Sequence, residues 1–114
     1  MLHNNAAATS ETLRDDDLAS MDVALWDHTM AVNVRGAFLG IKHALPRMLE
    51  RGGGVIVNTS SGASVAAEPH RIAYSASKGA INRFITGSVH AVDGGITAAV
   101  AYTADVQGRG PGIF

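Results

Sequence analysis

Hydrophobic residues between positions 23 and 49 recur at steps of three and four, which is the spacing of one face of a helix. Asp22 stands immediately before this pattern and predicts the N-cap. The glycine run 52–54 follows it and predicts the helix end, because glycine readily adopts the left-handed conformation that ends helices. We therefore expect one long helix over residues 23–49, whose apolar stripe consists of Val23, Trp26, Met30, Val34, Phe38, Ile41, Leu45 and Leu49.

The segment after these glycines, residues 55–57 (Val-Ile-Val), is β-branched and has no polar alternation. This composition is typical of a strand that is covered on both faces within a parallel sheet. A polar run at positions 58–61 follows, at the carboxyl end where open α/β sheets bind their ligands. Residues 73–84 predict a second helix and residues 89–92 a further short strand. A helix that leads into a buried strand and then into another helix indicates an α/β fold.

The remaining segments show no apolar period. Residues 8–22 are polar and acidic and predict a surface loop, with the run Asp15 to Asp17 exposed to solvent. Three glycines and a proline near the C-terminus, within residues 108–112, predict a flexible end. Because no repeat is present, we expect a single domain over residues 1–97 and a flexible tail over residues 98–114.

Composition narrows the range of partners. Nine Lys and Arg against ten Asp and Glu give a net charge of −1, so no basic field is available for nucleic acid or anionic lipid. The absence of Cys excludes a disulfide framework, a thiolate nucleophile and Cys-ligated zinc. The five His show no paired metal spacing, and no apolar run approaches the ~18 residues of a membrane span. We expect a cytoplasmic protein without a metal site and without a nucleic-acid or membrane partner.

Tyr74 and Lys78 are four residues apart, so on a helix they lie one turn apart on the same face. A phenol has an ordinary pKa of ~10 and is a poor base at neutral pH unless a nearby cation favours the phenolate. Ser61, 13 residues before Tyr74, stands at a strand end, where a hydroxyl can donate to a substrate carbonyl. Taken alone, the Tyr-x-x-x-Lys spacing is also typical of a surface tyrosine beside a solvated lysine.

Further motifs accompany this pair in a defined order. Residues 33–36 (Asn-Val-Arg-Gly), 56–61 (Ile-Val-Asn-Thr-Ser-Ser) and 74–78 (Tyr-Ser-Ala-Ser-Lys) together resemble the short-chain dehydrogenase/reductase family. Residues 4–7 (Asn-Asn-Ala-Ala) resemble the Asn-Asn-Ala-Gly signature of that family, with Ala7 in place of the glycine. The resemblance implies a partial Rossmann-like fragment of a doubly wound parallel sheet, which has three layers, α/β/α, in the whole family.

The resemblance also implies a role for each matched residue. Tyr74 would be the general acid/base, and Lys78 would lower the pKa of its phenol and bind the nicotinamide ribose. Ser61 would orient the substrate carbonyl or alcohol, and Asn33 would hold a water behind Lys78. The implied reaction interconverts a secondary alcohol and a ketone by hydride transfer with NAD or NADP. The implied cofactor-binding residues are Asn5, Ala6, Tyr74 and Lys78.

The chain also departs from the family pattern. The glycine-rich turn that holds the pyrophosphate of the cofactor is absent, and only 15 residues separate Lys78 from Asp93. We therefore expect a member of the family that is truncated at the N-terminus and internally deleted. Because few strands are left to cover the long helices, their apolar faces should be incompletely buried.

These departures leave more than one function open. The first is an NAD(P)-dependent oxidoreductase. The second is a catalytically inactive fragment that associates with an intact relative through the helices at 23–49 and 73–84. An unrelated α/β binding module is a third. The resemblance further implies a homo-oligomer in which the long helix packs against its copy, and the spacing of Gly36 and Gly40 fits either that contact or a close contact within the chain.

Overall fold

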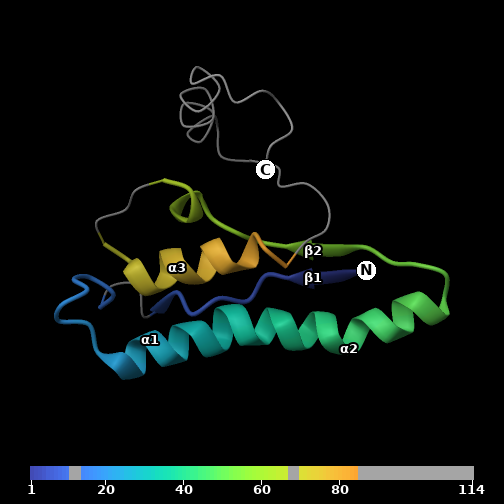
Figure 1. The fold of residues 1–114 in the computed structure, drawn as a ribbon, viewed down its shortest axis with the longest axis horizontal. Helices are drawn as coiled ribbons and strands as arrows, with labels where there is room; N and C mark the ends of the chain where they lie inside the picture. The colour runs from blue at the N-terminus through green and yellow to red at the C-terminus, as the bar shows by residue number, and fades with distance from the viewer. Residues whose placement is uncertain (11–13, 67–69, 85–114) are drawn as a thin grey trace, which may run out of the picture.

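The computed structural model describes residues 1–10, 14–66 and 70–84 of the chain (Figure 1). Strand β1 (Leu2–Asn4) pairs in parallel with strand β2 (Ile56–Asn58), so that Leu2 lies opposite Ile56 and Asn4 opposite Asn58. A continuous helical rod connects the two strands. It consists of helix α1 (Val23–Met30), a π-helical turn η2 (Ala31–Arg35) and helix α2 (Gly36–Glu50). A 3-10 turn, η3 (Gly62–Ser64), and helix α3 (Ile72–Ile81) follow β2.

The strand, rod and strand form a βαβ unit with a parallel sheet, which confirms the predicted α/β class. Helix α2 packs against β1, while α3 packs against α1 and η2 (Figure 1). The buried hydrophobic residues of the described chain lie mainly along these contacts, and they are Ala8, Leu25, Ala37, Ala63, Ala73 and Ile81.

Both ends of the rod follow from the local sequence as predicted. The Asp22 carboxylate accepts a hydrogen bond from the Ala24 N–H at 2.9 Å, which is the N-cap interaction. At the other end Gly52 and Gly53 have φ values of 81° and 137°, which side-chain-bearing residues rarely adopt. The Gly53 N–H donates to the Met48 carbonyl oxygen at 2.8 Å and closes the last turn.

The rod is not one uniform α-helix, which corrects the prediction for residues 23–49. In η2 the Gly36 N–H donates to the Ala31 carbonyl oxygen, a step of five residues instead of four. Hydrophobic periodicity does not report such a turn, because one added residue leaves the spacing of its neighbours nearly unchanged. Turns of this kind occur frequently at functional sites, and this one contains the buried residue Asn33.

The predicted apolar stripe is not the buried face of the rod. Val23 and Leu49 are 71% and 69% exposed, and Phe38 is also exposed. The residues that pack inward are, apart from Leu25, small or polar, and they are Leu25, Thr29, Asn33 and Ala37. Periodicity identifies an apolar face but not what that face contacts. The expectation that the helices leave apolar side chains exposed is confirmed.

Two further expectations meet a definite outcome. Val55 and Val57 are exposed, so the prediction of a strand covered on both faces is wrong for the described residues. Gly40 makes a close contact within the chain, because a Cβ there would lie 2.8 Å from Asn4 Oδ1. Gly36 has far more room, since its nearest neighbour, the Ala31 carbonyl oxygen, is 3.8 Å from the same position.

Among the described residues, no helix has the length and apolar character needed to cross a bilayer. The strand predicted at 89–92, the tail predicted at 98–114, and the domain boundary between 97 and 98 lie outside the described residues. These three statements stay predictions.

Candidate active site

A cavity of about 210 Å³ lies where the end of β1 meets η2, α2 and α3. Its lining includes four of the residues proposed from the sequence, which come from three separate segments of the chain. Asn5 and Ala6 follow β1, while Asn33 comes from η2. The fourth, Lys78, comes from α3. Ser61 and Tyr74, although described, are outside this lining.

Lys78 is the buried cation of this cavity. Its side chain is 3% exposed, and its Nζ donates to the Thr59 carbonyl oxygen at 2.8 Å. Burial lowers the pKa of the Lys78 ammonium group below its ordinary value of 10.5, because desolvation disfavours the charged form. An ammonium group has three N–H donors, so the bond to Thr59 leaves two of them for a ligand.

Tyr74 lies on the first turn of α3, one turn before Lys78. The Lys78 Nζ is 5.7 Å from the centre of the Tyr74 ring, which is within the range of a cation–π contact. The spacing in the sequence therefore brings the two side chains onto one face of a helix. Tyr74 is half-buried and Lys78 is buried, so this is not the solvated surface pair that the same spacing also allows.

Asn33 connects three segments through its side-chain amide. Its Oδ1 accepts from the Ala8 N–H at 2.7 Å, and its Nδ2 donates to Ser77 Oγ at 2.8 Å. Ser77 Oγ in turn donates to the Tyr74 carbonyl oxygen at 2.6 Å. The π-helical turn thus holds both the segment after β1 and helix α3, with all of these groups buried or half-buried.

Ser61 is the N-cap residue of the η3 turn. Its Oγ accepts from the Ala63 N–H at 3.2 Å, which leaves the hydroxyl proton of Ser61 to be donated elsewhere. The neighbouring Ser60, which the sequence analysis did not single out, donates from Oγ to the Lys78 carbonyl oxygen at 3.0 Å. This bond ties the polar end of β2 to α3 beside its lysine.

Asp15 is the buried residue next to Tyr74 that the sequence analysis missed, and its predicted exposure is wrong. The Asp15 side chain is 1% exposed, and its two carboxylate oxygens accept from the Ala73 N–H at 2.9 Å and the Tyr74 N–H at 2.8 Å. Asp16 and Asp17 are exposed as predicted. A signal was available at residue 71, because the N-cap position of α3 holds Arg, a residue type without the short side-chain acceptor that N-caps favour.

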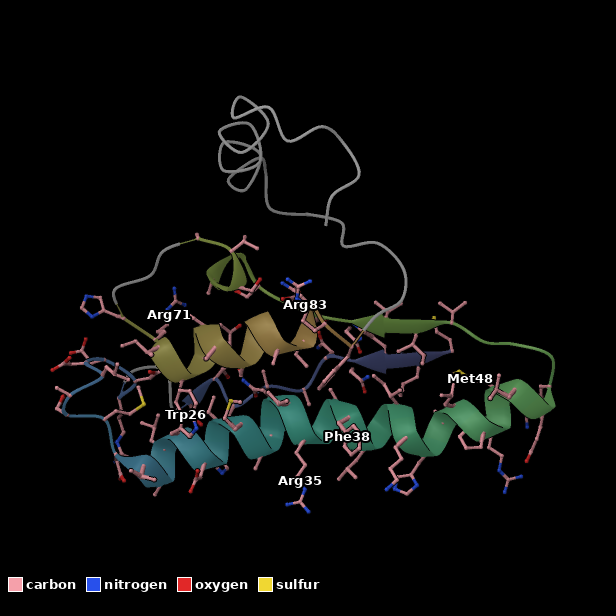
Figure 2. All side chains as sticks on the ribbon, viewed as in Figure 1. Trp26, Arg35, Phe38, Met48, Arg71 and Arg83 are labelled. Carbon is pink, nitrogen blue, oxygen red and sulfur yellow. The ribbon has the colours of Figure 1, made fainter. Side chains whose placement is uncertain are left out.

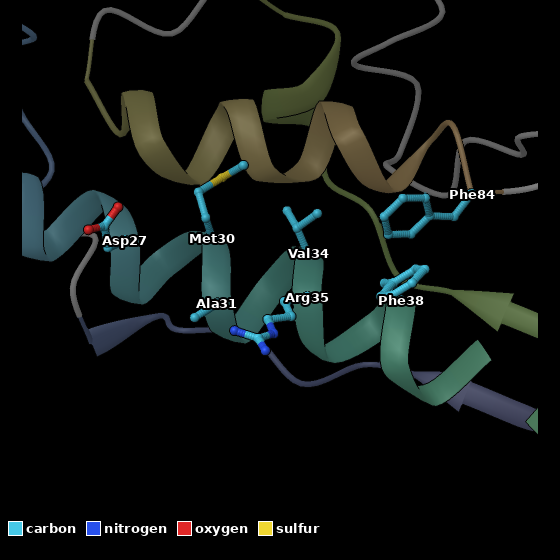
Figure 3. Close-up of a pocket in the computed structure, with 7 residues that line it drawn as sticks. All are labelled: Asp27, Met30, Ala31, Val34, Arg35, Phe38 and Phe84. Carbon is cyan, nitrogen blue, oxygen red and sulfur yellow. The ribbon is translucent and has the colours of Figure 1, made fainter. Parts of the chain in front are cut away.

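A second and larger hollow, of about 480 Å³, lies along the rod, where Figure 3 shows the ring of Phe38 facing that of Phe84. Met30 and Val34 supply further apolar lining, and the charged residues Asp27 and Arg35 border it. Figure 2 shows Arg35 pointing away from the strands. This hollow is open, apolar and separate from the cavity that holds Lys78.

Comparisons with known proteins agree with this geometry. Residues 1–107 match the short chain dehydrogenase family. A probable short-chain type dehydrogenase/reductase of Bradyrhizobium diazoefficiens is 45% identical over 82 residues, which cover 72% of this chain and 29% of that protein. The 2-(R)-hydroxypropyl-CoM dehydrogenase of Xanthobacter autotrophicus is 50% identical over 81 residues, which cover 71% and 32%. The solved structure of ElxO with NADP bound has a TM-score of 0.65 at 27% identity, over 91% of this chain and 36% of that one.

The parallel βαβ unit and its likeness to a solved structure define a Rossmann-like α/β protein. The chain belongs to the short-chain dehydrogenase family, because the family match extends over 107 of its 114 residues. Membership confirms the resemblance seen in the sequence, and the named dehydrogenases among its relatives are oxidoreductases. The chain spans about a third of the length of these relatives.

Proposed function

We propose that this chain carries the catalytic segment of an NAD- or NADP-dependent oxidoreductase that interconverts a secondary alcohol and a ketone. The observation that carries the proposal is the buried Lys78 ammonium group at the wall of a cavity, beside the Tyr74 ring. A dehydrogenase of a 2-hydroxypropyl compound among the relatives supports the alcohol chemistry. The bound NADP of the similar solved structure supports the cofactor class.

The residues of the cavity fit one end of such a cofactor. The two remaining donors of Lys78 suit the neighbouring hydroxyls of a ribose, and Asn5 adds a side-chain amide at the rim. Pockets that enclose a drug-sized ligand measure ~300–1,000 Å³, so about 210 Å³ suits the nicotinamide riboside end and not a whole dinucleotide. When bound, the nicotinamide supplies or accepts the hydride.

The protein groups then handle the proton and the substrate oxygen. Tyr74 Oη gives its proton to the carbonyl oxygen in reduction and takes a proton from the alcohol in oxidation. The positive charge of Lys78 stabilises the negative charge that develops on the phenol as the proton leaves. The Ser61 hydroxyl, which already accepts from the Ala63 N–H, donates a hydrogen bond to the substrate oxygen and orients it, while keeping its own proton.

Titration of the purified chain with NADH and NADPH, followed by nicotinamide fluorescence, tests the proposal. Lys78→Ala removes the buried ammonium group, while Lys42→Ala removes an exposed one that lies over Phe38 and serves as the matched control. We expect micromolar binding that is lost in Lys78→Ala and kept in Lys42→Ala. Absence of binding at millimolar cofactor would overturn the proposal.

A second proposal concerns association, and the exposed apolar hollow along the rod favours it. We propose that a second copy of this chain covers the hollow through the helices at 23–49 and 73–84. Asp27 and Arg35 are eight residues apart, roughly 12 Å along a helix, with the small residue Ala31 midway. A twofold axis at Ala31 sets Asp27 of each copy opposite Arg35 of the other, which makes the surface self-complementary.

Charge substitutions test this association in sedimentation experiments. Asp27→Arg and Arg35→Asp each place like charges opposite one another, and each should weaken dimerisation by at least about tenfold. The double variant exchanges the two signs and should recover the dimer. A chain that stays monomeric at all concentrations, or a double variant no better than the single ones, would show that this surface does not bind its own copy.

A further inference from the structure

We propose that Asp15 is the positioning residue of Tyr74. The inference rests on the proposed function, because it concerns the alignment of the proposed general acid/base. The buried carboxylate of Asp15 binds the N–H groups of Ala73 and Tyr74. These residues follow Asp15 by 58 and 59 positions in the sequence. Asp15 does not line the cavity among the described residues, and its carboxylate binds backbone N–H groups, so it acts through the backbone of α3.

Helix α3 begins without a cap of its own. Its first turn leaves N–H groups that no helical carbonyl can accept, and the side chain of the N-cap residue Arg71 does not accept from them. Asp15 takes this place from a distant segment, with one carboxylate oxygen on each of the second and third helical N–H groups. A carboxylate is favoured here because it also offsets the positive end of the helix dipole.

A third hydrogen bond of Asp15 holds residue 71, which immediately precedes helix α3. The Asp15 carbonyl oxygen accepts from the Arg71 N–H, and Arg71 has a φ of 62°, the one left-handed non-glycine residue in the described chain. A residue in this conformation is strained and persists only when its surroundings hold it. Asp15 therefore sets the backbone on both sides of the point where α3 starts.

Tyr74 is consequently held at both ends of its backbone. Its N–H donates to Asp15, and its carbonyl oxygen accepts from Ser77, which is held by Asn33. The Asn33 contact fixes α3 against the rod, and the Asp15 contact fixes the turn that carries the phenol. If the second contact is lost, the ring shifts relative to Lys78, while Lys78 itself, one turn later and bonded to Thr59, stays in place.

Enzyme kinetics separate positioning from a general loss of structure. Asp15→Asn keeps the shape and one acceptor oxygen, and Asp15→Ala removes both; Asp17→Asn, at an exposed carboxylate two residues away, is the matched control. We expect kcat to fall about tenfold in Asp15→Asn and about 100-fold in Asp15→Ala, since small misplacements cost that much. The Kd for NADPH should stay within about twofold, because the Lys78 contacts persist. A purely structural role would instead lower the binding capacity and the rate together.

A second readout does not depend on activity. The chain has two tyrosines, so Tyr102→Phe leaves Tyr74 as the single tyrosine signal in an NMR spectrum of tyrosine-labelled protein. Asp15→Asn and Asp15→Ala should shift the ring resonances of Tyr74, whereas Asp17→Asn should not. If the parent chain neither binds cofactor nor turns over substrate, the proposed function fails and this spectrum still decides the inference. Unchanged Tyr74 resonances in folded Asp15→Asn would overturn it, and Asp15→Asn remains decisive if Asp15→Ala does not fold.

Discussion

The helical rod has two faces of opposite composition, and their burial is the reverse of what composition suggests. Apart from Leu25, the inward face consists of small or polar residues, and the outward face carries larger apolar ones. Hydrophobicity alone would assign the two faces the other way round. Here the inward face is selected by close packing and by side-chain hydrogen bonds. The inward residues are Leu25, Thr29, Asn33 and Ala37, and the outward ones include Met30, Val34 and Phe38.

The difference between the faces indicates that the inward face serves folding and the site, and that the outward face is available for association. Four of the six buried hydrophobic residues in the described chain are alanines, and burial contributes only ~0.8 kcal/mol per CH₂ group. The inward face thus gains little from apolar area and depends on the bonds of Asn33 for its specificity. The outward face holds the apolar area that a second copy can bury. Changes on the inward face should therefore act on folding and on the site, and changes on the outward face on association.

The largest effect is expected where the inward bonds are broken. Asn33→Ala leaves the buried Ala8 N–H without a partner, at ~1–3 kcal/mol, and removes one further hydrogen bond, to Ser77 Oγ, at ~0.5–1.5 kcal/mol, although Ser77 keeps its bond to Tyr74. The free energy of unfolding should therefore fall by about 2–4 kcal/mol. Urea denaturation at a fixed protein concentration measures this loss.

Val34→Ala is the control on the outward face. Val34 is half-exposed and lines the open hollow, so its truncation should cost less than about 1.5 kcal/mol. Equal losses in the two variants would show that the faces do not differ in the way proposed here.

Two glycines on helix α2 sharpen the comparison, because we expect their substitution by alanine to change stability in opposite directions. Gly40→Ala brings a Cβ to 2.8 Å from Asn4 Oδ1, whose amide also donates to Asn58, so a cost of about 1–3 kcal/mol is expected. Gly36→Ala meets nothing closer than 3.8 Å and should gain up to about 1 kcal/mol from the better helix propensity of alanine. Thermal unfolding of the two variants beside the parent checks both signs. Stabilisation by Gly40→Ala would mean that Asn4 moves freely out of this contact.

The sequence predicted those features that depend on neighbouring residues. The Asp22 cap, the end of the rod at Gly52 and Gly53, and the helical spacing of Tyr74 and Lys78 all arise within a few positions of one another. The family motifs added long-range information, because they placed residues from separate segments in one site before any contact was known. The roles assigned to those residues stay proposals.

Features that depend on distant contacts were not predictable in the same way. Asp15 looks like its exposed neighbours in the sequence, and only the packing of its segment against α3 distinguishes it. The π-helical turn at Asn33 is another example, since the side chain that it aims inward binds groups 25 and 44 residues away. The orientation of the rod belongs here too, because an apolar stripe fits a core and an exposed hollow equally well.

The smallest effect concerns Lys78, because the cost of burying its charge depends on pH. Because burial lowers the pKa of Lys78 below 10.5, the unfolded chain binds more protons than the folded one between the lowered value and 10.5. Stability therefore rises with pH across this window, whereas below it the cost of burying the charge is present in full. Lys78→Met removes the titrating group, so urea midpoints measured from pH 7 to 10 should rise in the parent relative to this variant. Lys42→Met, at an exposed position, should keep the rise of the parent, and parallel curves for the parent and Lys78→Met would show that the Lys78 ammonium group is not buried in solution.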